Sequence, residues 1–287
     1  MEVAMPGDRV GVIYVAAGPD AYNAELYEIR LGSTLCARRL TLRARVSDVT
    51  ASDELLIAST ARGLIGDRLE IFREGRFRSV PHLGRPYVFS PTIAPGGRFL
   101  AIDRPSGHNN RLHTIVVVDL RSGRRVPVFR TRQTRMAPGE LAWGPDRWIA
   151  FPLGQRTRRT IMVVSADGHA RPIASTGWTS RIAWFPSRLI ALSTPLAFRE
   201  GRTIILDPAG ATVAAIEGWS AVTWSPDGEM LLVQRRDGAL GAASAPGWEV
   251  EVLGPSPVGL IYSSTAWLRG PIPGVIPQRM GDLSAPT

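Results

Sequence analysis

The stretch Ala221-Val-Thr-Trp-Ser-Pro-Asp-Gly-Glu-Met-Leu-Leu-Val233 decides the fold. It predicts a short strand at 221–224, a tight turn, and a second strand at 229–233. Ser-Pro-Asp-Gly has the chemistry of a turn, because proline presets φ, aspartate bonds its own backbone, and glycine tolerates a positive φ. The stretch therefore predicts a β-hairpin, and weaker copies of this hairpin recur along most of the chain.

The copies have a regular spacing. Residues 92–102 align with residues 223–233 without a gap. Positions equivalent to Trp224 are 43, 50, 41, 40 and 43 residues apart; we call them the anchors, and they are Thr50, Ile93, Trp143, Trp184, Trp224 and Trp267. A third strand such as 114–119 and a polar outer strand such as 125–129 follow each hairpin. A period of this length with four short strands is typical of a β-propeller.

The two ends of the chain each carry an incomplete unit. Residues 6–13 align with 226–233, and residues 264–269 supply only a first strand. Pairing the two halves removes exposed strand edges. The sequence therefore predicts an all-β, six-bladed β-propeller in a single domain (1–270), with its ring closed by N-terminal strands pairing with the C-terminal strand. The predicted blades are 6–44 with 257–269, then 45–81, 84–130, 136–175, 176–217 and 218–254, followed by an extended or disordered tail at 271–287.

A family resemblance rests on the same phrase. Trp224-Ser-Pro-Asp-Gly228 followed by an apolar strand resembles the repeat of TolB-like six-bladed propellers, and it is also similar to the propeller domains of prolyl-oligopeptidase-type proteins. The resemblance covers about residues 6–269. It implies a protein-binding or scaffolding role, often in the bacterial envelope.

The N-terminus and the hydropathy pattern give an expectation for location. Residues 1–9 have neither the basic start nor the apolar core of a signal peptide. No apolar run approaches the roughly 18 residues that a membrane span needs. We therefore expect a cytoplasmic protein as the sequence stands, or a periplasmic or extracellular one if a leader or anchor has been removed.

The chain is rich in arginine and free of lysine. Its 34 basic residues exceed its 25 acidic ones, which gives a net charge of +9. Such a charge can indicate nucleic-acid binding. The arginine clusters at 121–135 and 156–159 fall at predicted strand ends with few aromatic residues between them. The sequence therefore disfavours a nucleic-acid partner.

Residues that could perform chemistry are few. Cys36 is the single cysteine, which excludes an internal disulfide. None of the histidines stands in a metal-binding motif, so neither a metal nor another cofactor is expected. Gly218-Trp-Ser-Ala-Val222 lacks the closing glycine of a nucleophile elbow, and no hydrolase domain follows it. We therefore assign no catalytic residue.

Candidate ligand-binding residues lie in the loops that lead from the outer strand of one blade to the first strand of the next, which we call the connecting loops. Trp178, Trp219 and Tyr262 take equivalent places in three consecutive connecting loops. Three such rings around the channel would form an apolar platform for a peptide or sugar. Alternatively, each ring packs within the repeat. Nearby Arg181 is predicted to bind a carboxylate, and the remaining candidates are His82, Arg85, Tyr87 and Glu140.

The predicted function follows from this platform. The sequence favours a non-enzymatic binding or scaffold propeller that recognises a protein, peptide, sugar or other small ligand at the channel face. The alternative is an enzyme, such as a lyase, hydrolase or cyclase, with a polar site at the channel mouth. Two titratable side chains converging in the channel would favour the enzyme. The tryptophan anchors, which are Trp143, Trp184, Trp224 and Trp267, are assigned to packing between blades.

Overall fold

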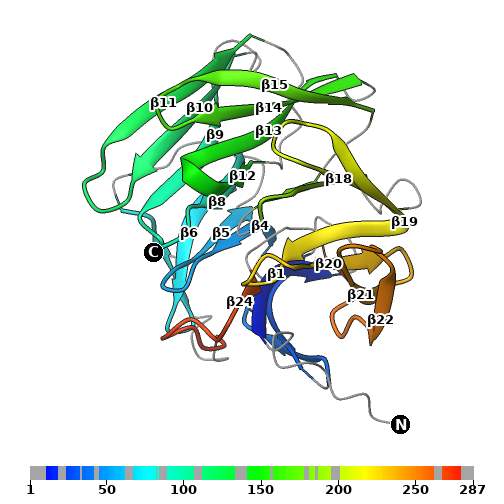
Figure 1. Cartoon of the computed structure of the whole chain (residues 1–287). Helices are drawn as coiled ribbons and strands as arrows, with labels where there is room; N and C mark the ends of the chain where they lie inside the picture. Colours follow the sequence, from blue (N-terminus) through cyan, green and yellow to red (C-terminus); the bar gives the residue numbers. More distant parts are fainter. Residues whose placement is uncertain are drawn as a thin grey trace.

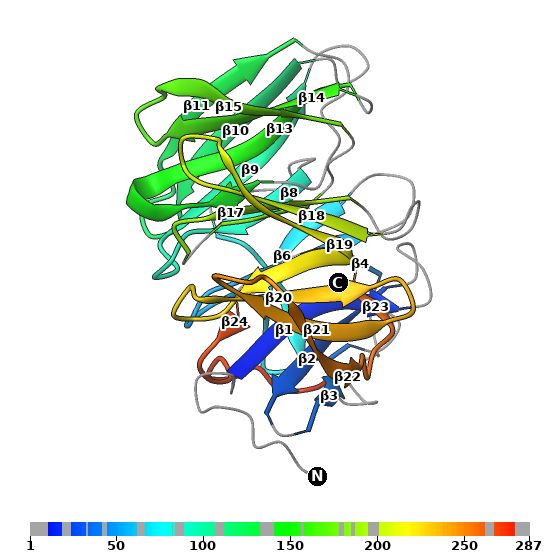
Figure 2. The same cartoon turned by 45° about the vertical axis from the view of Figure 1, so that its right-hand side comes forward.

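The computed structural model of the chain is built almost entirely from β-strands arranged in small antiparallel sheets around a centre (Figures 1 and 2). It describes residues 11–18, 24–32, 34–41, 45–61, 67–81, 83, 89–106, 112–132, 141–155, 158–177, 181–184, 187–194, 201–261 and 267–278. Within these ranges the single helical element is the 3-10 turn η4 (Pro145–Arg147). The predicted all-β, propeller-like architecture is confirmed.

One sheet contains both ends of the chain, and we call it the closing sheet. Its strands are β23 (Leu260–Ile261), β24 (Trp267–Leu268), β1 (Gly11–Gly18), β2 (Glu25–Leu31) and β3 (Cys36–Arg39). The inner strand of this sheet is in two pieces, β23 and β24, and both pair with β1. Ile13 lies opposite Trp267, and Val12 lies opposite Leu268. Further along β1, Ala17 lies opposite Ile261. The predicted closure of the ring by N-terminal strands is therefore confirmed.

Three further sheets each contain four antiparallel strands in chain order. The first sheet contains β4 (Val46–Ala51), β5 (Leu56–Ala61), β6 (Asp67–Arg73) and β7 (Arg76–Ser79). The second contains β8 (Phe89–Ile93), β9 (Phe99–Ser106), β10 (Leu112–Asp119) and β11 (Arg125–Thr131). The third contains β12 (Ala142–Trp143), β13 (Trp148–Gln155), β14 (Arg158–Ser165) and β15 (Ala170–Thr176).

The remaining strands form one hydrogen-bonded sheet of seven, and β19 has two roles in it. The strands are β16 (Arg181–Ala183), β17 (Ile190–Ser193), β18 (Gly201–Leu206), β19 (Thr212–Trp224), β20 (Met230–Arg235), β21 (Ala239–Ser244) and β22 (Val250–Pro255). Residues up to Gly218 of β19 pair with β18, whereas residues from Trp219 pair with β20. Dividing the sheet there gives a fourth and a fifth sheet of four strands each. The predicted count of six blades depends on this division.

Hydrophobic side chains pack between neighbouring sheets all round the ring. Among the described residues, one buried cluster lies between each sheet and the next. Ile57 and Leu69 of the first sheet, for example, pack with Ile102 of the second. Ile13 of the closing sheet packs with Val222 of the fifth. Because the clusters join the divided sheets in a closed circle, they favour a count of six.

The inner strands are β4, β8, β12, β16, the second half of β19, and β23 with β24. Side chains of neighbouring sheets bond to the backbone along their open edges. Thr50 Oγ1 accepts a hydrogen bond from the Ile93 N–H at 2.8 Å. The indole N–H of Trp143 donates to the Thr92 carbonyl at 2.7 Å. These bonds satisfy backbone groups that no neighbouring strand pairs, and they also fix each sheet against the next.

The tryptophan anchors divide into two kinds. The indole N–H of Trp224 donates to the Ala183 carbonyl at 3.1 Å, in the same way as Trp143 bonds to its neighbour. By contrast, the buried indole nitrogens of Trp184 and Trp267 have no hydrogen-bond partner among the described residues. All four rings belong to the hydrophobic clusters between sheets. The predicted packing role of the tryptophan anchors is confirmed.

The chain continues past β24 along the closing sheet. Residues 271–278 of the predicted tail have no regular secondary structure, and they pack between the closing sheet and the first sheet. Ile272 and Val275 are buried there, with 3% and 5% of their surfaces exposed. Residues 279–287 lie outside the described part of the chain.

Candidate functional site

A cavity of about 340 Å³ lies where the inner strands meet, and every sheet contributes to its wall. The lining residues come from the ends of the inner strands and from the turns that follow them. They are Thr50–Asp53, Thr92–Ile93, Pro95–Gly96, Leu141–Trp143, Ile182–Trp184, Val222–Thr223, Pro226 and Trp267–Arg269. Five of the six anchors are in this set, so the repeated hairpin itself builds the cavity.

The cavity has polar walls and a charged rim. The side chains of Thr50 and Thr223 are buried in its wall, and Thr92 is half-buried. Asp53 and Arg269 are exposed, and they lie in the segments that follow inner strands β4 and β24. Hydroxyl groups and one charge of each sign can orient a polar ligand, while the apolar parts of the wall can contact its apolar groups.

Arg181 lies next to the cavity, at the opposite ends of the inner strands. One of its terminal nitrogens donates to the Ala221 carbonyl at 3.3 Å, and the other donates to the Ile261 carbonyl. The side chain therefore links the inner strands of the fourth, fifth and closing sheets. Ile182, the next residue in the chain, lines the cavity.

Comparisons with known proteins give a fold but no sequence family. No protein-family model and no curated protein sequence matches the chain. Among solved structures, TolB from Acinetobacter baumannii superposes with a TM-score of 0.64 at 15% identity, over 93% of this chain and 68% of that one. A putative TolB from Agrobacterium tumefaciens gives a TM-score of 0.55 at 17% identity, over 76% of this chain and 87% of that one. The fold is that of a TolB-like β-propeller.

The same propeller fold also occurs in an enzyme that resembles this chain. Oligogalacturonate lyase from Vibrio parahaemolyticus superposes with a TM-score of 0.55 at 12% identity, covering 88% of this chain and 80% of that one. Identities this low establish the propeller and nothing about its ligand. The described part of the chain has no helix long and apolar enough to cross a membrane.

Two of the residues predicted to bind ligand lie in the described part of this TolB-like propeller. Trp219 has 8% of its surface exposed and packs in the cluster between the fourth and fifth sheets. The guanidinium group of Arg235 lies over its ring, 5.2 Å from the ring centre. Two terminal nitrogens of Arg181 donate hydrogen bonds to the backbone carbonyls of Ala221 and Ile261. Neither residue is among those that line the cavity.

The other predicted ligand-binding residues lie outside the described part of the chain. They are His82, Arg85, Tyr87, Glu140, Trp178 and Tyr262. The aromatic platform at the connecting loops therefore stays a prediction. The cavity lies at the other ends of the inner strands. Sequence reasoning misses the lining residues as ligand contacts because it assigns the tryptophan anchors to packing alone, although the repeat alignment marks the anchors as equivalent positions.

Outside the cavity, the described residues include a buried His–Asp pair. His113 Nδ1 lies 2.8 Å from Asp103 Oδ2, and both side chains are almost fully buried between β9 and β10. His108 lies outside the described residues. No group of three or more His, Cys, Asp or Glu side chains within the described ranges is placed to hold a metal ion. Cys36 is exposed and unpaired with another cysteine.

Proposed function

We propose that the chain is a non-enzymatic binding protein whose central cavity receives a short segment of a protein partner or a comparably small ligand. The observation that carries this proposal is the convergence of every inner strand on one cavity of about 340 Å³. That volume is near the lower end of the range for ligand pockets. It suits a chain terminus, a loop tip or a few side chains.

The geometry of the ring supports binding in two ways. Clusters between all the sheets make the cavity wall rigid, so little ordering is needed when a ligand enters. Thr92 and Thr223 supply hydroxyl groups inside, while Asp53 and Arg269 supply opposite charges at the rim. A peptide segment offers matching groups, because its backbone both donates and accepts hydrogen bonds. The TolB neighbours support a protein partner.

The alternative function is an enzyme with a polar site at the channel mouth, and the lyase neighbour supports it. Acid–base catalysis needs a proton donor and acceptor within reach of one reacting group. Among the described lining residues, Asp53 and Arg269 are the titratable side chains, and both lie at the exposed rim. This arrangement favours binding over catalysis at the cavity.

Selection from a phage-displayed library of random peptides tests the proposal. We expect wild-type protein to enrich peptides whose affinity falls at least tenfold in a Thr92→Trp variant, because the indole fills the cavity. The matched control is Val252→Trp on outer strand β22, where 57% of the side chain is exposed and binding should persist. Titration calorimetry measures both affinities, and near-ultraviolet circular dichroism checks the fold. Equal affinity in the Thr92→Trp variant, or failure to enrich any peptide, contradicts cavity binding.

A direct assay addresses the alternative. Oligogalacturonate incubated with the protein should give no unsaturated product in the ultraviolet if the chain is a binding protein. Product formation that disappears in the Thr92→Trp variant would instead assign a lyase activity to the cavity.

A further inference from the structure

The segment that follows β24, residues 270–278, occupies a site of its own between two sheets, and we call it the C-terminal segment. Ile272 and Val275 join a buried hydrophobic cluster with residues of the closing sheet and the first sheet. Within that cluster lie Tyr14 of β1 and Phe72 of β6, which have 0% and 1% of their surfaces exposed. The segment therefore docks two apolar side chains into the core of the seam between these sheets.

A β-turn brings the two apolar side chains together. The Val275 N–H donates to the Ile272 carbonyl at 3.2 Å, which closes a four-residue turn. Its central residues are Pro273 and Gly274, and Gly274 has a φ of 78°. Proline followed by a glycine at positive φ is the pattern of a type II turn. Because Pro-Gly favours this turn before docking, less entropy is lost when Ile272 and Val275 are buried.

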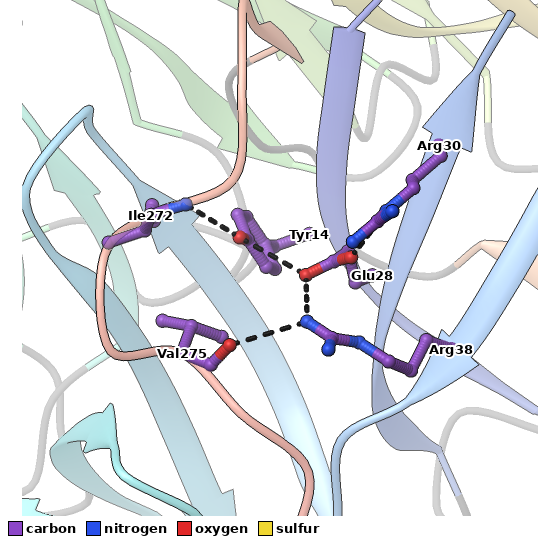
Figure 3. A network of polar contacts seen from close by, with 6 residues as sticks. All are labelled: Tyr14, Glu28, Arg30, Arg38, Ile272 and Val275. Atoms are coloured by element: carbon purple, nitrogen blue, oxygen red, sulfur yellow. Dashed lines mark hydrogen bonds and ion pairs between the residues drawn. The ribbon is translucent and has the colours of Figure 1, made fainter.

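The closing sheet holds the turn by its main chain (Figure 3). The Ile272 N–H donates to the Tyr14 hydroxyl oxygen at 2.9 Å. The terminal nitrogen Nη2 of Arg38 donates to the Val275 carbonyl at 3.3 Å. These bonds go to backbone atoms at both ends of the turn, so they recognise its shape.

Further main-chain bonds hold the segment from the first sheet and from the end of β3. The Glu74 N–H donates to the Gly274 carbonyl at 2.7 Å, and the Gln278 N–H donates to the Leu40 carbonyl at 2.8 Å. Gly75 leaves room for the segment, because a Cβ there would lie 2.9 Å from the Pro277 carbonyl oxygen. The segment is thus bound along its length by backbone bonds, with two side chains in apolar pockets.

Glu28 organises the binding groups on the closing sheet (Figure 3). Its side chain is fully buried, and its Oε2 accepts hydrogen bonds from Arg38 Nη2 at 2.6 Å and from the Tyr14 hydroxyl at 3.4 Å. Arg30 Nε bonds to its other oxygen at 3.0 Å. A buried carboxylate is costly unless it is paired. Here it orients the Tyr14 hydroxyl and Arg38, both of which contact the turn.

We propose that the seam site, formed by Tyr14, Glu28, Arg38, Leu40 and Glu74, is a peptide-recognition site for a segment with the pattern apolar-Pro-Gly-apolar. Residues 272–275 fill it in the intact chain, and it accepts the same sequence from a separate peptide when its own segment is displaced. The recognition uses backbone hydrogen bonds for affinity and two apolar pockets for selectivity, as in other peptide-binding sites. The proposal does not depend on the central cavity.

Tethering explains why a weakened segment is needed to reveal the site. A segment joined to the chain next to its site has an effective concentration on the order of millimolar or more. A separate peptide at micromolar concentration therefore cannot compete with the intact segment. Substitutions in the segment leave the binding groups of the sheets unchanged, so they open the site without altering it.

Fluorescence anisotropy with a labelled peptide tests the proposal. The probe is Gly-Pro-Ile-Pro-Gly-Val-Ile-Pro-Gln, the sequence of residues 270–278, and the protein is the full chain carrying Ile272→Asp and Val275→Asp. We expect saturable binding that is at least tenfold tighter than binding to the wild-type chain. A control peptide with both apolar residues replaced by aspartate should not bind. Adding Tyr14→Phe to the variant should weaken probe binding about fivefold, since it removes the hydroxyl oxygen that accepts a hydrogen bond from the backbone N–H of the first residue of the turn.

The outcome that overturns the proposal is a folded double variant that does not bind the probe, or one that binds probe and control peptide equally. If circular dichroism shows that the double variant is unfolded, the single substitution Val275→Ala replaces it. That variant loses only part of one apolar contact, and it must bind the probe more tightly than the wild-type chain does. Equal binding by the two proteins overturns the proposal as well.

Discussion

Replacing Trp143 and, in a separate variant, Trp184 with phenylalanine tests how the inner strands are joined. The two residues are equivalent anchors in neighbouring sheets, and both rings are buried. The Trp143 N–H donates to the Thr92 carbonyl at 2.7 Å, whereas the Trp184 N–H has no partner among the described residues. Phenylalanine removes the N–H in both cases, but it breaks a hydrogen bond in only one.

The expected difference follows from these contacts. Each replacement removes a similar apolar area, which costs about 1 kcal/mol in either variant. At position 143 the carbonyl of half-buried Thr92 also loses its partner, which costs about 1–3 kcal/mol more. At position 184 an N–H that is buried without a partner is removed, which offsets part of the lost area. Trp143→Phe should therefore lower the free energy of unfolding by about 2 kcal/mol more than Trp184→Phe does.

Urea denaturation followed by fluorescence measures both free energies, and equal m-values confirm that the same unfolding is compared. For a chain of 287 residues, about 2 kcal/mol corresponds to roughly 3 °C in the midpoint of thermal unfolding. Trp224→Phe and Trp267→Phe repeat the comparison, since Trp224 has a bond to a neighbouring carbonyl and Trp267 has no partner in the described residues. The reasoning is refuted if, in both pairs of variants, the two losses of unfolding free energy agree within about 0.5 kcal/mol. The hydrogen bonds made by Trp143 and Trp224 would then contribute nothing that Trp184 and Trp267 lack.

Three further predictions concern single side chains. Arg181→Gln should lower the free energy of unfolding in urea by about 1–3 kcal/mol, because it removes a link from the fourth sheet to the Ile261 carbonyl of the closing sheet; an unchanged value would contradict this. The hydrogen bond from Arg98 lowers the pKa of Asp119 from 3.8 to about 2. The ionised Asp119 therefore stabilises the folded protein above pH 3.8, and this contribution is lost as the pH falls through about 2. Asp119→Asn should flatten the pH dependence of the thermal midpoint across this interval, and an unaltered slope would count against the pair. Burial raises the pKa of Tyr14 from 10.0 to about 12, so its stabilising effect is present below pH 10 and is lost as the pH rises through 12. An ultraviolet titration of the wild-type protein should therefore show one tyrosine step near pH 12 that is missing in Tyr14→Phe. Identical titration curves for the two proteins in that range would contradict the raised pKa.

Much of the architecture is encoded locally, which is why the sequence predicts it. Ser225-Pro-Asp-Gly228 specifies a turn within a few residues, and the Ser225 N–H and carbonyl indeed close that turn through bonds to Met230 and Gly228. The repeat then gives the number and order of strands without any long-range information. The half-units at the two ends predict that the N-terminal strand pairs with the strand of Trp267, and Ile13 lies opposite Trp267 in the structure.

The candidate sites depend on contacts that no local pattern reveals. The cavity is formed by residues from all the sheets, so its size follows only from how the sheets pack. The seam site joins Tyr14 to Ile272, which are 258 positions apart in the chain. Glu28 and Arg38 read in the sequence as ordinary charges on a strand pair. Nothing in their spacing predicts that the carboxylate is buried and bonds the two side chains, Tyr14 and Arg38, that hold the C-terminal segment.

The pairing of β1 with β24 also has a consequence during synthesis. Ile13 leaves the ribosome long before Trp267, its partner strand residue, has been made. At about 5–20 residues per second, the interval between them is roughly 10–50 s. Throughout that time the nascent chain has one blade without its innermost strand, and its backbone donors and acceptors are available to any other extended polypeptide. A chaperone that shields β1 until translation ends would therefore improve the yield of native protein, and slowing translation without one would reduce it.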